Sequence, residues 1–159
     1  MFSAADWSDH PDMGNRRQAR ELALQILFQW DIHGNTDHWL ADFWEKQDVD
    51  PEVRAFTDCL VDGVMARRAD LDREIGDQAS NWKVSRMPIV DRNILRAAVF
   101  ELLEVSEVPA KVTVNEAIEL AKRFADEEGK AFVNGILDAI LKRHPKLEAK
   151  RAQMELSTG

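Results

Sequence analysis

Three arginines stand close together near the start of the chain, in the run NRRQAR that opens the first apolar helical pattern. Asn15 is a favourable N-cap and Gln18 follows three residues later, as in a capping box, so a helix is predicted to begin there. Arg16, Arg17 and Arg20 then lie in or just beyond its first turn, where the helix dipole disfavours each cation by about 0.3–1 kcal/mol. Helix starts bind phosphate, so these cations are explained if RNA or another polyphosphate completes the site.

A second interpretation of the arginines stays open. They can belong to a solvated helix start, with Arg17 or Arg20 paired to Glu21 or to the acidic N-terminal segment. The net charge of −8 also opposes nucleic acid at long range. Any RNA site must therefore be a local basic patch, or a partner protein must add positive surface.

Catalytic and metal-binding patterns find little support. The histidine pair His33 and His38 has no third ligand at a recognised metal spacing, and no phosphate-cradling loop or nucleophile motif is present. Cys59 is the single cysteine and is predicted to be a small core residue. Glu116 and Glu119 are predicted to lie on a solvated helix face. We therefore expect a non-enzymatic protein with no metal and no cofactor.

The chain also lacks the apolar run of about 18 residues that a membrane-crossing helix needs, so no membrane association is expected. Its first fourteen residues contain aspartates and no Lys or Arg, which is unlike a secretory signal. A cytoplasmic protein is the expectation.

Every strong hydrophobic period in the chain is helical, which predicts an all-α protein. Three segments are expected: an acidic N-terminal extension (1–15), a helical domain (16–144) and a polar C-terminal tail (145–159). The tail can be a helical extension or disordered, and a frayed helix is favoured. The first expected helix runs from 16 to 33 and stops before Gly34, and the second runs from Thr36 to about 47. A long helical stretch runs from Pro51 to about 79, with bends at Gly63 and Gly76. Further helices begin at Pro88, at a capping box at Thr113–Glu116, and after an acidic turn at 126–129, and the last of them ends at Pro145.

Gly135 is unusual, because it stands inside the apolar pattern of the last core helix, where it costs about 1 kcal/mol relative to Ala. Close packing of helices would explain it, and so would the approach of a ligand or a partner's backbone.

Four blocks of sequence together resemble the NusB family of bacterial transcription antitermination factors. They are RxARxxAxQxL from Arg17, VDRNILR from Val90, VPxKVxVNEAIELAK from Val108 and FVNGILD from Phe132. The resemblance covers about residues 16–142. It implies a single domain of two packed three-helix bundles that binds the boxA element of ribosomal RNA leaders. It also implies pairing with the small-subunit ribosomal protein NusE and entry into an RNA polymerase antitermination complex.

The resemblance also implies roles for individual residues. Gln18 falls where many members carry a further Arg, and Asp91 has a rival role in capping or pairing at the helix start after Pro88. An alternative to the whole function is a protein-interaction scaffold or a homodimer without direct RNA contact. The implied RNA-binding residues are Arg16, Arg17, Arg20, Phe124, Glu128, Lys130 and Phe132, and the implied partner-binding residues are Phe28 and Asp91.

Overall fold

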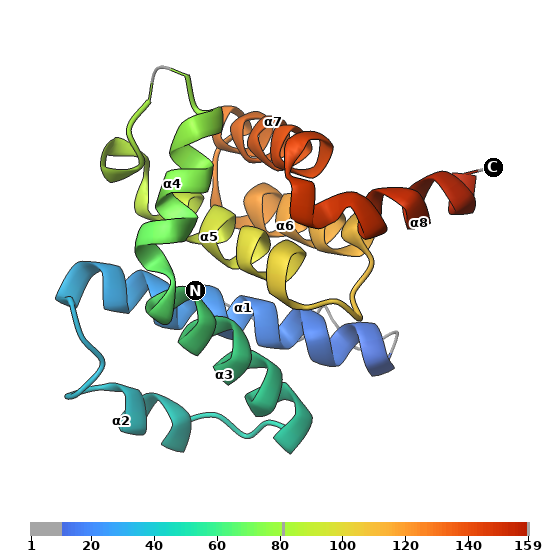
Figure 1. Ribbon diagram of the computed structural model, residues 1–159. Helices are drawn as coiled ribbons and strands as arrows, with labels where there is room; N and C mark the ends of the chain where they lie inside the picture. The colour runs from blue at the N-terminus through green and yellow to red at the C-terminus, as the bar shows by residue number, and fades with distance from the viewer. Residues whose placement is uncertain (1–10, 81, 159) are drawn as a thin grey trace. The chain divides into compact units, whose positions relative to one another are not determined.

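The computed structural model describes residues 11–80 and 82–158, and every regular element in these ranges is a helix (Figure 1). The predicted all-α class is confirmed. By their contacts the residues form two compact units, 1–63 and 64–159, which are described in turn. The elements are α1 Pro11–His33, α2 Leu40–Glu45, α3 Pro51–Ala66, α4 Arg68–Gln78, η2 Val84–Arg86, α5 Ile89–Glu104, α6 Ala110–Phe124, α7 Glu127–Arg143, η3 Pro145–Leu147 and α8 Glu148–Thr158.

The first unit is built on α1 and α3. The hydroxyl of Thr57 on α3 donates hydrogen bonds to the backbone carbonyl of Ala19 on α1 at 3.3 Å and to that of Val53 at 2.7 Å. The predicted stop of α1 is confirmed: Gly34 has a φ of 82°, and its N–H donates to the Trp30 carbonyl at 2.7 Å. A left-handed residue at that position suits glycine, because a side chain would strain the backbone.

Two sequence predictions in this unit are wrong. Thr36 begins a turn and not a helix, and α2 starts only at Leu40. Cys59 is exposed and is not a core residue. It lies on α3 away from the stripe of Val53, Leu60 and Val64, whose side chains are buried. The predicted extension 1–15 lies mostly outside the described residues.

The long helical stretch after Pro51 breaks at Arg67, where α3 ends and α4 begins. Gly63 and Gly76, the two positions predicted for bends, both lie inside helices. Arg67 is held by an ion pair with Glu104, and its guanidinium lies 5.9 Å from the ring centroid of Phe100. These contacts come from residues on α5, so the local sequence carries no sign of the break.

In the second unit α5 packs against α4, α6 and α7, and most of its side chains are buried. It begins directly after Pro88, as predicted. Helix α6 begins at Ala110 after Pro109, so the predicted capping box at Thr113 is wrong. Thr113 is buried one turn inside the helix and donates its hydroxyl hydrogen to the carboxylate of Glu101 at 3.0 Å. Glu116, expected on a solvated face, is only 5% exposed.

The acidic stretch 126–129, predicted to form a turn before the last core helix, forms the N-cap and first turn of α7. The side chain of Asp126 caps α7 by accepting a hydrogen bond from the Gly129 N–H at 2.7 Å. Beyond Pro145 the chain forms α8, the helical alternative for the tail. Lys150 donates to the carbonyls of Glu101 and Val105, at 3.3 Å and 2.8 Å. Arg151 donates to the carbonyls of Leu141 and His144, at 2.9 Å and 2.7 Å.

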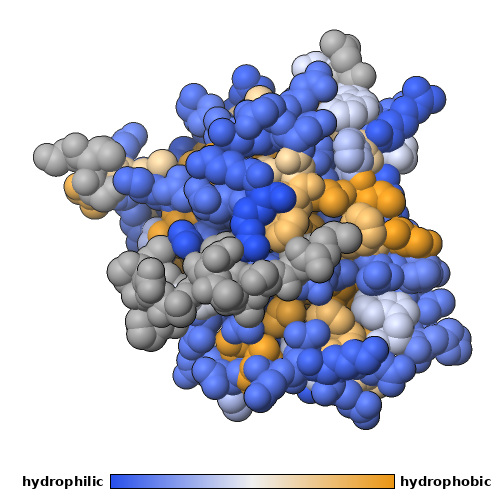
Figure 2. All heavy atoms as spheres, turned by 180° about the vertical axis from the view of Figure 1, so that it is seen from behind, coloured by the Kyte–Doolittle hydropathy of each residue, from blue (hydrophilic) through white to orange (hydrophobic). Residues whose placement is uncertain are grey.

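Seen from behind, the surface is mainly hydrophilic and apolar atoms reach it in separate patches (Figure 2). None of the helices in the described ranges combines the length and apolar character needed to cross a bilayer.

Candidate nucleic-acid interface

The arginines of α1 gather around one aromatic ring in the first unit. The guanidinium carbon of Arg16 lies 4.6 Å from the ring centroid of Phe56 on α3, and that of Arg20 lies 5.4 Å from the same centroid. A cation over an aromatic face is stabilised by the ring quadrupole, by about 0.5–1 kcal/mol at exposed sites. Phe56 therefore holds two like charges close together.

The helix start predicted at Asn15 is wrong, because α1 already begins at Pro11. Proline suits the first helical position, since it has no N–H to leave unsatisfied and its φ is already helical. The arginines consequently lie in the second and third turns, beyond the strongest effect of the helix dipole. Arg20 is only 7% exposed, and Arg16 and Arg17 are half-buried.

The second predicted RNA-facing region lies in the second unit and is split by helix geometry. Phe132 and Glu128 are one helical turn apart on α7 and share a face, and Glu128 is exposed. Lys130 is two residues from Phe132, so it projects from a different side of the helix. Phe124 ends α6, and the guanidinium of Arg123 lies 5.0 Å from its ring centroid.

The structure adds an aromatic residue that the sequence analysis missed. The ring centroid of Trp82 lies 4.7 Å from that of Phe132, with the planes inclined by 59°. The signal in the sequence was a tryptophan within the polar segment SNWKVSR, between two helical patterns. The sequence analysis also missed Phe56, because its position fits an apolar helical pattern and does not show the arginine contacts described above.

The two residues expected to face a partner belong to different units. Phe28 is half-buried on α1. Asp91, in the first turn of α5, is 4% exposed, and burial together with the nearby Asp126 carboxylate raises its pKa. No side chain caps the start of α5, and the carboxylate of Asp91 makes no hydrogen bond or ion pair among the described residues. The rival prediction that Asp91 caps or pairs at this helix start is therefore wrong.

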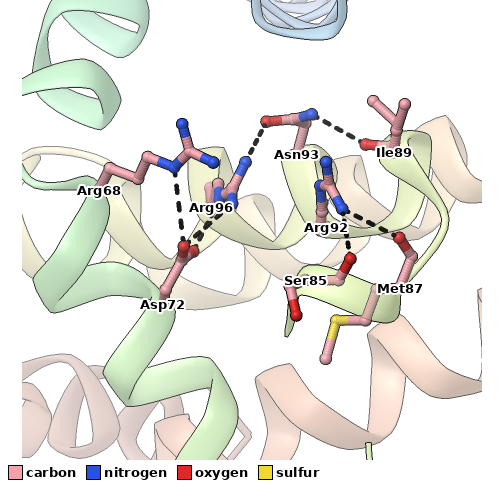
Figure 3. Close-up of polar contacts among 8 residues, drawn as sticks. All are labelled: Arg68, Asp72, Ser85, Met87, Ile89, Arg92, Asn93 and Arg96. Carbon is pink, nitrogen blue, oxygen red and sulfur yellow. Dashed lines mark hydrogen bonds and ion pairs between the residues drawn. The ribbon is translucent and has the colours of Figure 1, made fainter. Parts of the chain in front are cut away.

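The block VDRNILR, in contrast, holds the second unit together (Figure 3). Arg96 is 1% exposed and donates from Nε and Nη2 to both carboxylate oxygens of Asp72 on α4, at 2.7 Å and 2.9 Å. Arg68 approaches the same carboxylate at 3.9 Å. Arg92 donates to the backbone carbonyls of Ser85 and Met87, which fixes the segment before α5.

The helical fold and the arginine–aromatic cluster are typical of a nucleic-acid-binding module. Among the described residues no group of three His, Cys, Asp or Glu side chains is placed to hold a metal ion. A sequence model described as the NusB family matches residues 17–142, and the chain belongs to this family.

Named relatives agree with that assignment. The chain is 50% identical over 131 residues to the transcription antitermination protein NusB of Desulforapulum autotrophicum, covering 80% of this chain and 92% of that protein. It is 47% identical over 129 residues to the NusB of Trichlorobacter lovleyi, covering 80% and 91%.

Solved structures have the same fold. T. maritima NusB has a TM-score of 0.75 and 35% identity, covering 86% of this chain and 96% of that chain. A crystal structure of the antitermination factors NusB and NusE in complex with double-stranded RNA has a TM-score of 0.73 and 30% identity, covering 82% and 98%.

Proposed function

We propose that this protein is a non-catalytic transcription antitermination factor that binds boxA-containing RNA together with the ribosomal protein NusE. The observation that carries the proposal is the pair of guanidiniums, from Arg16 and Arg20, that lie over the ring of Phe56. Both arginines belong to α1, the helix in which the family match begins. The protein acts in the cytoplasm as part of an RNA polymerase antitermination complex.

The arginine cluster supplies the phosphate contacts. Arg16 and Arg20 are four residues apart and share one ring, and like charges at this spacing repel. An RNA phosphate accepts charge-assisted hydrogen bonds from the guanidinium edges. Arg16 and Arg17, the more accessible members, contact the backbone, while the buried Arg20 positions Phe56 and Arg16.

Phe124, Glu128, Lys130 and Phe132 form a second RNA-facing region within the proposal. The Phe132 face of α7 meets the bases, and Lys130 reaches a phosphate from another side of the same helix. Glu128, being anionic, accepts hydrogen bonds from base amino groups and does not contact phosphate.

Asp91 and Phe28 are the contacts proposed for NusE. A buried carboxylate without a partner is costly, and a cation from NusE that reached Asp91 would remove that cost. The same cation would lower the raised pKa of Asp91. The half-buried Phe28 supplies an apolar contact on the first unit.

The test is a titration of boxA-like RNA with the protein, with and without NusE, over a series of salt concentrations. Binding through phosphates weakens as salt rises, and each lost phosphate contact lowers the slope of log K against log salt by about 0.7 for single strands. Arg16→Ala and Arg17→Ala are expected to reduce both the affinity and this slope.

The matched control is Arg54→Ala. Arg54 lies in the same unit, and its guanidinium is also 4.6 Å from an aromatic ring centroid, that of Trp44. Its loss is expected to leave boxA affinity unchanged. Equal affinity of the Arg16, Arg17 and native proteins would overturn the arginine assignment. Binding to NusE without any RNA binding would favour the scaffold alternative.

A further inference from the structure

Trp82 is an exposed tryptophan whose position no internal packing fully explains. It follows α4 and precedes η2, and its side chain is 38% exposed. Among the residues that the structure describes, three large apolar residues are exposed: Ile32, Trp82 and Leu156. Trp82 is the aromatic residue of the three. Exposing an indole ring to water is unfavourable unless something covers it.

Two contacts hold Trp82 in place. Phe132 of α7 lies against the indole at the ring distance given above, and the backbone N–H of Trp82 donates to the Ala79 carbonyl at 3.2 Å. Phe132 thus supports the indole from the protein side. A fixed aromatic ring of this kind loses little conformational entropy when a ligand stacks on it.

Trp82 also lines a shallow groove of about 660 Å³ between α4 and the segment before α5. Its charged lining residues are Arg73, Lys83 and Asp72, and the carboxylate of Asp72 is already bound by Arg96. The ammonium group of Lys83 makes no hydrogen bond or ion pair with any described residue, and only its backbone carbonyl accepts one, from the Arg86 N–H at 2.9 Å. The groove therefore joins an aromatic face to an uncompensated cation, although the chain as a whole carries a charge of −8.

An aromatic ring beside a cation is the pairing that binds single-stranded nucleic acid, because every base has a face that can stack. We propose that Trp82, supported by Phe132, stacks on an unpaired RNA base, and that Lys83 binds the adjoining phosphate. The inference rests on the proposed function and extends its RNA surface to a residue outside the arginine cluster. The occupant is RNA and not a protein, because Lys83 and the ring together match a nucleotide.

The experiment compares Trp82→Leu, which keeps apolar volume over Phe132, with Trp82→Phe, which keeps an aromatic face. Both are titrated with the same boxA-like RNA, with and without NusE, after thermal unfolding has shown that they fold. Loss of one stacked base weakens binding by roughly 5- to 150-fold. Trp82→Leu is expected within that range, with an unchanged salt slope, whereas Trp82→Phe stays close to the native protein.

Lys83→Ala provides the complementary measurement. It is expected to weaken binding and to lower the salt slope, while Lys111→Ala, an exposed cation on α6, leaves both unchanged. Tryptophan fluorescence gives an independent readout: RNA quenches the native protein more strongly than Trp82→Phe, because the stacked indole is absent from the variant.

The outcomes separate the two proposals. If the native protein binds RNA and Trp82→Leu binds equally well, the stacking role is overturned and the RNA-binding function stands. If Trp82→Leu loses NusE binding but keeps RNA affinity, the surface is a protein contact and the inference is wrong. If the native protein binds no RNA even with NusE, the proposed function fails and the inference fails with it.

Discussion

Two glycines of α7 provide a sharp test of the packing described here. An ideal Cβ built on Gly135 meets nothing within 4 Å, so close packing within the protein does not explain this residue. A Cβ on Gly129 would lie 2.8 Å and 3.0 Å from the carboxylate oxygens of Asp91 and 3.1 Å from the Cβ of Ala125. The same substitution in one helix should therefore have opposite effects.

Replacing a helix-interior glycine with alanine stabilises the folded state by about 1 kcal/mol when the new methyl group is accommodated. Gly135→Ala should gain that amount, which raises the Tm by roughly 3 °C for a chain of this size. At Gly129 the methyl group displaces the Asp91 carboxylate, which is buried and has little room to move. Overpacking costs about 1–3 kcal/mol, so after the gain of about 1 kcal/mol from helix propensity we expect a net loss of up to about 2 kcal/mol.

The assay is urea unfolding followed by far-UV circular dichroism, with Asp91→Ala and the double variant Gly129→Ala/Asp91→Ala completing a cycle. If the clash is the cause, removing the carboxylate restores most of the stability lost at Gly129, and the cycle shows a coupling energy above about 0.5 kcal/mol. The reasoning is refuted if Gly129→Ala stabilises the protein as much as Gly135→Ala does, or if the two sites are additive with Asp91.

Three further outcomes are expected. Arg96→Lys should reduce the free energy of unfolding by about 3 kcal/mol or more in a urea titration, because lysine cannot make the bidentate contact with Asp72 and leaves a buried charge poorly paired; a loss below about 1 kcal/mol would contradict this. The raised pKa of Asp91, caused by burial and by Asp126, means that the folded state holds this proton more tightly than the unfolded state. The free energy of unfolding of the native protein, relative to that of Asp91→Asn, should therefore fall as the pH rises from below the ordinary value of 3.8 through the raised pKa. If this difference in free energy stays constant between pH 3 and pH 7, the pKa of Asp91 is not raised. Gly34→Ala should destabilise by about 1 kcal/mol in the same assay because φ is positive there, and an unchanged unfolding midpoint would argue against that conformation.

The helices were predictable because their apolar periods are strong, and the starts after Pro88 and at Pro51 were predicted correctly, but other starts were not. Capping-box patterns placed two starts at Asn15 and Thr113, whereas α1 and α6 begin earlier, at Pro11 and after Pro109. A threonine followed by an acid three residues later also fits a helix interior when another helix supplies a partner. Glu101 of α5 does so for Thr113, and a contact over twelve residues is invisible to a local pattern.

The types of residue in the candidate RNA-binding site could be predicted from the sequence, but their arrangement in space was harder to predict. The arginine cluster is evident from composition, but the ring that organises it, Phe56, is distant in sequence from Arg16 and Arg20. Trp82 and Phe132 are fifty positions apart, so only folding reveals their contact. The burial of Asp91 was likewise hidden, since a polar residue in a first helical turn is usually solvated.

The basic pair on α8 affects the order in which the second unit can be completed during synthesis. Lys150 closes the end of α5 and Arg151 closes the end of α7, so each helix leaves the ribosome before the residue that satisfies its last carbonyls. A nascent chain that has emerged only as far as α7 therefore carries two open helix ends. Those last carbonyls can accept their side-chain hydrogen bonds only after α8 has emerged and docked.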